Sequence, residues 1–133
     1  MKVLIDTPIW SLALRRRAPA DAPPVLALRR LIDEGRAAIV GPIRQELLSG
    51  IRDRAGFDRL RAHLAAFPDE PIAQADYERA AQHVNTCRAR GVQGSNTDFL
   101  LCAVAERHRT PILTTDADFA RYARLIPIAL YEA

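Results

Sequence analysis

Cysteine is scarce in this chain, and long apolar runs are absent. Cys87 and Cys102 are the only cysteines, and neither belongs to a CxxC pair or has a histidine at metal-ligand spacing. This argues against a zinc site and against a disulfide framework. No apolar run approaches the ~18 residues that a membrane span needs. The start of the chain, with one lysine and the short apolar run Val3-Leu4-Ile5 before Asp6, does not resemble a signal peptide. We therefore expect a cytoplasmic protein of bacterial type with no membrane partner.

Internal repeats, low-complexity tracts and linker-like segments are also absent. The length of 133 residues lies close to the commonest domain size, and the chain is 49% apolar and 26% charged. These values are typical of an ordinary globular protein. We therefore expect one domain spanning residues 1–133.

Lysine is nearly missing as well, so the positive charge comes almost entirely from arginine. The formal net charge is +3, the isoelectric point is near 9.3, and Lys2 is the only lysine. A basic balance suits a polyanionic partner such as RNA, and arginine can bind phosphates through two N–H groups at once. A GC-rich coding bias explains the preference for arginine equally well.

Short apolar runs alternate with segments of helical periodicity along the chain. Alternation of this kind requires crossover connections, which indicate an α/β fold with a mostly parallel sheet covered by helices on both faces. The predicted strands cover 3–5, 37–40, 112–115 and 128–130, with a brief extended segment at 71–72. The predicted helices centre on 9–13, 25–34, 42–51, 57–67, 77–87, 96–105 and 119–123.

Four acidic residues stand where such a fold places an active site. Asp6 and Asp116 each follow an apolar run, Glu46 lies one turn into the helix that Gly41-Pro42 opens, and Asp98 lies in the first turn of another helix. The carboxyl ends of parallel strands share one edge, so these side chains are expected to converge there. Two unit charges ~4 Å apart repel by roughly 4 kcal/mol at an effective dielectric constant of ~20. Such a cluster stays ionised only around a cation, and oxygen ligands suit Mg²⁺ or Mn²⁺. The pattern predicts metal-assisted hydrolysis.

Each acid also has a purely structural interpretation. Asp6 can cap the helix that starts near Pro8, and Glu46 can be a solvated helix residue. Asp98 stands at capping-box spacing from Ser95, and Asp118 at the same spacing from Thr115. Asp118 is therefore the better structural cap and Asp116 the better ligand. The joint placement of the four acids, rather than any one of them, favours a site.

Two further groups of residues accompany the acids. Polar side chains beside them can orient the carboxylates or the waters of a metal, or can be turn and cap residues; these are Thr7, Ser95, Asn96, Thr114 and Thr115. Basic side chains near the expected cleft can contact RNA phosphates, or can be solvated surface residues; these are Arg15, Arg16, Arg17 and Arg44.

The acidic motifs together resemble PIN-domain nucleases, and in particular the VapC toxins of bacterial toxin–antitoxin pairs. The motifs are Leu4-Ile5-Asp6-Thr7-Pro8-Ile9-Trp10, the stretch 46–50, the stretch 96–105 and the stretch 112–119. The resemblance spans the chain and implies a three-layer α/β/α fold with a parallel sheet of four or five strands. It assigns the family's acids to Asp6, Glu46, Asp98 and Asp116, with Asp118 as a rival for the fourth position.

The same resemblance implies an activity and partners. We expect a Mg²⁺- or Mn²⁺-dependent endoribonuclease that acts on structured RNA, with transfer RNA and ribosomal RNA both plausible, that forms a homodimer and is inhibited by a cognate antitoxin. Asp6, Asp98 and Asp116 would bind the metal, with Glu46 acting directly or through water. The alternatives are a PIN nuclease for RNA processing without an antitoxin, and a catalytically silent RNA- or protein-binding module. A phosphatase or receiver domain does not fit, because no Asp-x-Asp motif follows Ile5.

Overall fold

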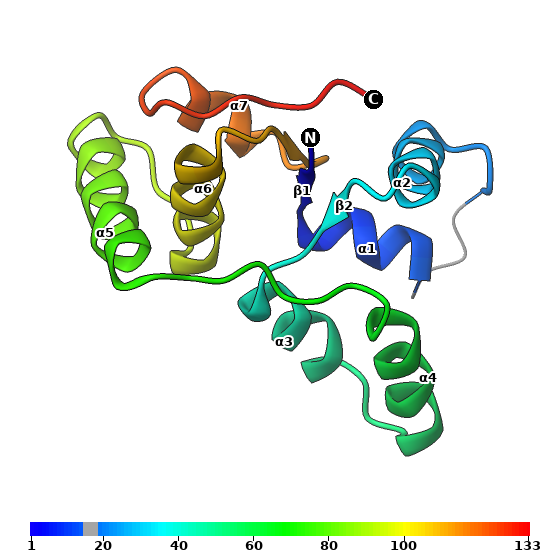
Figure 1. Cartoon of the computed structure of the whole chain (residues 1–133). Coiled ribbons are helices and arrows are strands. Elements are labelled where there is room, and N and C mark those ends of the chain that lie inside the picture. The colour runs from blue at the N-terminus through cyan, green and yellow to red at the C-terminus, as the bar shows by residue number, and fades with distance from the viewer. Residues whose placement is uncertain (15–18) are drawn as a thin grey trace.

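The strands form a small parallel sheet at the centre of the molecule (Figure 1). The computed structural model describes residues 1–14 and 19–133. Within them the sheet order is β2-β1-β3, with β1 at Val3–Ile5, β2 at Ala37–Ala38 and β3 at Ile112–Leu113. Leu4 pairs with Ala38 on one side and with Ile112 on the other. The residues of β1 and β3 are buried, as expected for a sheet covered on both faces.

The sheet is smaller than the four to five strands predicted. In the described residues it has three strands, and two further segments each join by a single parallel bridge, Asp69 to Ile39 and Leu130 to Ile112. Proline explains the short pairing, because Pro68 and Pro71 flank the first segment and Pro127 precedes the second, and proline has no N–H to donate to a ladder. The predicted segment 128–130 therefore forms one bridge without becoming a strand, and the predicted segment 71–72 forms none, since the bridge in that region lies at Asp69.

Helices cover both faces of the sheet, as the alternating pattern predicts. In Figure 1, α1 and α2 lie on one side of the strands and α5 and α6 on the other, while α3 and α4 form a hairpin beyond the sheet. The bounds are α1 Thr7–Leu14, α2 Pro23–Asp33, α3 Gly41–Ser49, α4 Arg54–Leu64, α5 Gln74–Ala89, α6 Asn96–His108 and α7 Asp118–Ala123. In the ranges described, none of these helices has the length and apolar character needed to cross a membrane.

The most buried helix is α6. Every residue from Phe99 to Ala105 is buried, which agrees with the unbroken apolar run in the sequence. Ser95 caps this helix, because its Oγ accepts a hydrogen bond from the backbone N–H of Asp98 at 3.0 Å. The cap fixes the first turn of α6, and with it the position of the Asp98 side chain.

Trp10 anchors α1 to the sheet. Its side chain is fully buried, and its Nε1 donates to the carbonyl of Ile5 at 3.0 Å. The indole ring also packs edge-on against Phe67, with 5.0 Å between ring centroids. These contacts fix the start of α1 directly after Asp6.

Candidate active site

An open cavity of about 470 Å³ lies at the carboxyl edge of the sheet and contains all four predicted acids. They reach it from four parts of the chain: Asp6 follows β1, Glu46 belongs to α3, Asp98 to α6, and Asp116 follows β3. Within residues 1–14 and 19–133 the lining consists of Asp6, Thr7, Pro8, Ser11, Leu12, Glu46, Ser95, Asp98, Thr115 and Asp116. These described residues contribute no lysine, arginine or histidine to it.

Asp6 is the most buried of the four acids, with 4% of its surface exposed. Its backbone N–H continues the ladder by donating to the carbonyl of Leu113 at 2.9 Å. Its carboxylate accepts two hydrogen bonds, from the N–H of Thr7 to Oδ1 at 2.9 Å and from the hydroxyl of Thr114 to Oδ2 at 2.8 Å. The carboxylate is therefore held in one orientation by neighbours on both sides.

The structure distinguishes between Asp116 and Asp118. Asp116 lines the cavity, and its Oδ1 accepts from the N–H of Asp118 at 2.9 Å, which holds the start of α7. The N–H of Asp116 in turn donates to the hydroxyl of Thr114 at 3.0 Å. Asp118 does not line the cavity and lies 3.9 Å from Arg121 on the next turn of α7. Asp116 is thus the acid that faces the other three.

Tyr122 is a neighbour of the site that the sequence did not single out. It is fully buried in α7, and its hydroxyl donates to Oδ2 of Asp98 at 3.2 Å. Burial and the adjacent Asp98 raise the pKa of Tyr122, so the phenol stays protonated and remains a donor. No sequence signal identifies it, because Phe119 and Tyr122 look like the core face of a short helix.

Glu46 completes the ring of acids from a more exposed position. Its Oε2 accepts a hydrogen bond from the hydroxyl of Thr7 at 3.0 Å. Thr7 therefore contacts two of the acids, Asp6 through its backbone and Glu46 through its side chain. The predicted accessory role of Thr7 agrees with this geometry.

Burial and mutual repulsion disfavour the ionised forms of two of the acids, Asp6 and Asp98. Burial raises the pKa of Asp6 to about 6, opposed by the hydrogen bonds from Thr114 and Thr7 and reinforced by the charges of Asp98 and Asp116. Burial likewise raises the pKa of Asp98, and the charge of Asp116 adds to the shift. A divalent cation in the cavity would relieve this repulsion.

Comparison with known proteins places the chain in a family. The family model described as the PIN domain matches residues 3–125 of this chain. The chain belongs to the PIN domain family. VapC ribonuclease Mb1587 of Mycobacterium bovis is 34% identical over 127 residues, which cover 92% of each chain.

Solved structures share the fold of this PIN domain. VapBC2 from Rickettsia felis, bound to a DNA fragment from its promoter, aligns with a TM-score of 0.79 at 15% identity, over 98% of each chain. A toxin–antitoxin complex from Klebsiella pneumoniae aligns with a TM-score of 0.66 at 25% identity, over 99% of this chain and all of that chain. The predicted three-layer α/β architecture is therefore confirmed, with the shorter sheet noted above.

The donor set of this PIN domain fits a hard divalent cation. All the charged groups that the described residues contribute to the lining are carboxylates, and burial disfavours the ionised form of the most buried one, Asp6. Among the side chains of residues 1–14 and 19–133, no three lie close enough to ligate one ion as they stand. Such an arrangement suits Mg²⁺, because Mg²⁺ keeps several water ligands and therefore needs few ligands from the protein. It suits less well an ion that protein side chains must surround completely.

Several predicted residues lie elsewhere in the PIN domain. Asn96 is exposed at the start of α6 and does not line the cavity, unlike Ser95 and Thr115. Arg44 is occupied in a structural role: its Nε donates to Asp69 at 2.8 Å, and its terminal nitrogens donate to the backbone carbonyls of Leu64, the last residue of α4, and of Phe67. The predicted RNA-binding residues Arg15, Arg16 and Arg17 lie outside the described residues.

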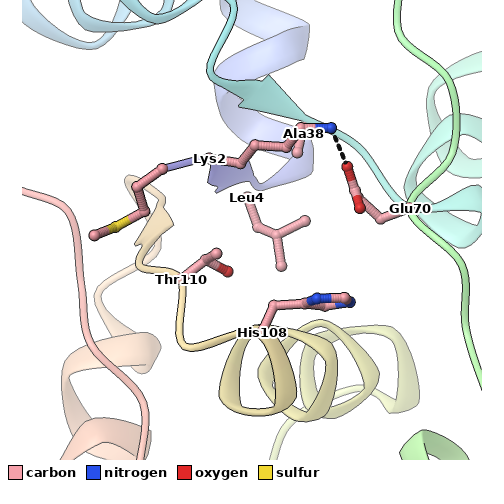
Figure 2. A pocket seen from close by; sticks show the side chains of 7 residues that line it. Lys2, Leu4, Ala38, Glu70, His108 and Thr110 are labelled. Atoms are coloured by element: carbon pink, nitrogen blue, oxygen red, sulfur yellow. Dashed lines mark hydrogen bonds and ion pairs between the residues drawn. The ribbon is translucent and has the colours of Figure 1, made fainter.

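The opposite edge of the sheet has a cavity of different character (Figure 2). It measures about 240 Å³, and Leu4 and Ala38 contribute to its lining. Its only carboxylate, Glu70, is already paired with Lys2 at 2.7 Å. Of these two cavities, only the one at the carboxyl edge gathers acids that form no ion pair with the described residues, and this edge is where an α/β sheet places its chemistry.

Proposed function

We propose that this protein is a Mg²⁺- or Mn²⁺-dependent endoribonuclease and the toxin of a toxin–antitoxin pair. The observation that carries the proposal is the cavity at the carboxyl edge of the sheet, where four carboxylates meet and the described part of the chain adds no basic side chain. The 34% identity to a protein named VapC ribonuclease, over 92% of both chains, supports the same activity. The family and the site thus support one reaction class, hydrolysis of RNA phosphodiester bonds, for which we propose a cytoplasmic location.

Asp6, Asp98 and Asp116 are the proposed metal ligands, with Glu46 acting directly or through water. A bound divalent ion supplies Lewis-acid chemistry, which activates water for attack on phosphorus and offsets the charge of the phosphate. The hydroxyl of Thr114 orients Asp6, and the hydroxyl of Tyr122 orients Asp98. The exposed Glu46 stands at the solvent side, where its carboxylate can accept a proton from an attacking water.

The proposed substrate is structured RNA, either transfer RNA or ribosomal RNA. The cavity is open, so a strand displayed in a loop can enter it, whereas a paired strand in a helix is less accessible. Direct attack by water leaves a 5′-phosphate and a 3′-hydroxyl and does not use the ribose 2′-hydroxyl.

The proposed partners are a cognate antitoxin and a second copy of the chain. Support for the antitoxin comes from the Rickettsia felis and Klebsiella pneumoniae structures, which are named as VapBC2 and as a toxin–antitoxin complex. The cavity that contains the four acids is here called the acidic cavity. An antitoxin that inhibits such a nuclease needs only to occupy or close off this cavity.

The deciding experiment compares wild type with Asp98→Asn on purified transfer RNA and ribosomal RNA, with Mg²⁺ and with EDTA. We expect cleavage by wild type with Mg²⁺ only, ends that carry 5′-phosphates, and loss of activity of at least about a hundredfold in Asp98→Asn. Cleavage that persists in EDTA, or a 2′,3′-cyclic phosphate product, would contradict the metal reaction. Cleavage in vitro without growth arrest on expression would instead indicate an RNA-processing nuclease.

A further inference from the structure

A second cavity, here called the basic cavity, lies beside the acidic one. It measures about 470 Å³ and is formed by the ends of α1 and α3, the segment that connects α3 to α4, and one side of α4 from Gly56 to His63. Among the described residues, three basic side chains line it: Arg52, Arg59 and His63. Its single carboxylate, Asp53, accepts a hydrogen bond from the N–H of Gly56 at 2.7 Å and caps α4.

The two cavities occupy successive turns of the same two helices. Ser11 of α1 and Glu46 of α3 line the acidic cavity. Leu14, one turn further along α1, and Gly50, which ends α3, line the basic cavity. One turn of helix advances about 5.4 Å, so a single extended strand can occupy both cavities.

The arginines of the basic cavity are available for a ligand. Within residues 1–14 and 19–133, neither Arg52 nor Arg59 forms an ion pair within 4.0 Å. The neighbouring Arg54 and Arg61 differ, because Asp58 lies 3.9 Å from the first and 3.2 Å from the second. The unpaired arginines thus face the cavity, and the paired ones lie outside its lining.

A polyanionic substrate needs such a cavity for an electrostatic reason. As far as the structure describes its lining, the acidic cavity has four carboxylates and no basic side chain, so without a metal these residues repel a phosphate backbone. Affinity for the strand must then come from positive charge close by. Arginine binds phosphate through two parallel N–H groups, and each neutralised phosphate releases counterions.

We propose that the basic cavity is a subsite for backbone phosphates of the RNA strand whose scissile bond lies in the acidic cavity. Arg52 and Arg59 are its phosphate-binding side chains, and His63 adds a ring N–H donor. This inference rests on the proposed function and adds to it the place where the strand is held next to the site of cleavage. It favours RNA over an acidic peptide, because a continuous strand whose scissile phosphate lies in the acidic cavity can extend along α1 and α3 into the basic cavity.

The test measures binding of a short fluorescein-labelled oligouridylate in EDTA, so that no cleavage occurs. The variant Arg52→Gln/Arg59→Gln is compared with Arg54→Gln/Arg61→Gln, which removes the same charge from the same helix region outside the cavity. We expect roughly tenfold weaker binding for the first variant at low salt. We also expect its plot of log affinity against log salt to flatten by about 0.7 for each lost phosphate contact. The variant Arg54→Gln/Arg61→Gln should stay close to wild type in both its affinity and the salt dependence of that affinity.

Two outcomes would overturn the proposal that the basic cavity binds RNA phosphates. Equal losses in both double variants would mean that only net charge matters. A polyglutamate peptide of matched charge that binds as tightly as the oligouridylate, and loses affinity equally in Arg52→Gln/Arg59→Gln, would assign the cavity to an acidic protein segment. Binding in EDTA does not depend on the metal reaction, so its failure is distinguishable from failure of the proposed hydrolysis. Circular dichroism and urea unfolding confirm that both variants are folded.

Discussion

The hydroxyl of Thr114 joins two of the acids: it donates to Oδ2 of Asp6 at 2.8 Å and accepts from the N–H of Asp116 at 3.0 Å. Asp6 and Thr114 follow β1 and β3, which are parallel neighbours, so a single side chain fixes the ends of both strands relative to each other. The same hydrogen bond lowers the pKa of Asp6 against the effect of burial. Thr114 is therefore central to the charge state of the site.

Replacing Thr114 by valine keeps the shape of the side chain and removes both hydrogen bonds. We expect the pKa of Asp6 to rise further and the Mg²⁺ concentration for half-maximal cleavage to increase about 10- to 100-fold. Loss of the buried hydrogen bonds should also lower the free energy of unfolding by about 1–3 kcal/mol. Cleavage assays across a Mg²⁺ titration and urea unfolding measure the two effects.

Thr110→Val is the matched control, because Thr110 lies at the other end of the same strand. Its Oγ1 is buried and has no hydrogen-bond partner among the described residues. Valine there should leave cleavage unchanged and leave stability unchanged or slightly higher. If cleavage by Thr114→Val and by Thr110→Val depended on the Mg²⁺ concentration in the same way, Thr114 would have no role at the site.

Replacing Asp6 by asparagine tests whether burial and the neighbouring charges disfavour the ionised form of Asp6. The test uses the pH dependence of the free energy of unfolding. The pKa of Asp6 is raised from 3.8 to about 6, so between these pH values the folded protein binds more protons than the unfolded chain. The stability contributed by Asp6 therefore falls as pH rises through that window, by about 3 kcal/mol in total. In metal-free buffer, Asp6→Asn should lack this decline and be about 1–3 kcal/mol more stable than wild type at pH 7.5, while cleavage is lost.

The measurement is urea unfolding of both proteins from pH 4 to pH 8 in EDTA. Added Mg²⁺ should stabilise wild type and leave Asp6→Asn almost unchanged, because only the ligand set of the wild type is complete. Parallel pH profiles for the two proteins would show that Asp6 is an ordinary solvated carboxyl.

The meeting of the four acids in one cavity could be anticipated from the sequence because its signals are local. Asp6 and Asp116 follow apolar runs, and Asp98 follows a Ser95 cap, so short stretches of chain place each acid at a strand or helix end. The parallel sheet then brings those ends together. The choice between Asp116 and Asp118 needed the structure, because the two have the same side chain and differ only in which way the turn before α7 directs it.

Other features could not be predicted, because they depend on contacts between distant segments. Tyr122 reaches Asp98 only when α7 packs beside α6, and Arg44 finds its acceptors only when α3 pairs with α4. The number of strands was overestimated for a different reason. The apolar residues at 71–72 and 128–130 indicate extended chain, but the prolines at 68, 71 and 127 limit pairing to one bridge at Asp69 and one at Leu130.

Gly94 tests the packing that holds Tyr122 against Asp98. A Cβ at Gly94 would lie 2.1 Å from the Tyr122 hydroxyl and 3.0 Å from the Phe99 ring, and the buried Tyr122 cannot move aside. We expect Gly94→Ala to destabilise the protein by at least about 2 kcal/mol and to reduce cleavage through Asp98.

Gly91→Ala is the matched comparison in the same loop. Gly91 has a φ of +76° and nothing within 4 Å of an added Cβ, so alanine there should cost only backbone strain, about 1 kcal/mol. Cleavage by Gly91→Ala should match wild type under conditions where both are folded. A smaller loss for Gly94→Ala than for Gly91→Ala would show that the loop adjusts and that Tyr122 is not held by it.

The identity of the fourth acid can be tested by replacing Asp116 and Asp118 separately with asparagine. Asp116 lines the acidic cavity and raises the pKa of both Asp6 and Asp98, whereas Asp118 lies outside the lining and near Arg121. Saturating Mg²⁺ at a hundred times its dissociation constant should stabilise wild type and Asp118→Asn by about 2.7 kcal/mol, and Asp116→Asn by much less. Thermal unfolding at several Mg²⁺ concentrations gives these values, and cleavage should follow the same order. If Asp118→Asn lost its response to Mg²⁺ and Asp116→Asn kept it, the turn before α7 would have to rearrange on metal binding, and Asp118 would take the fourth position.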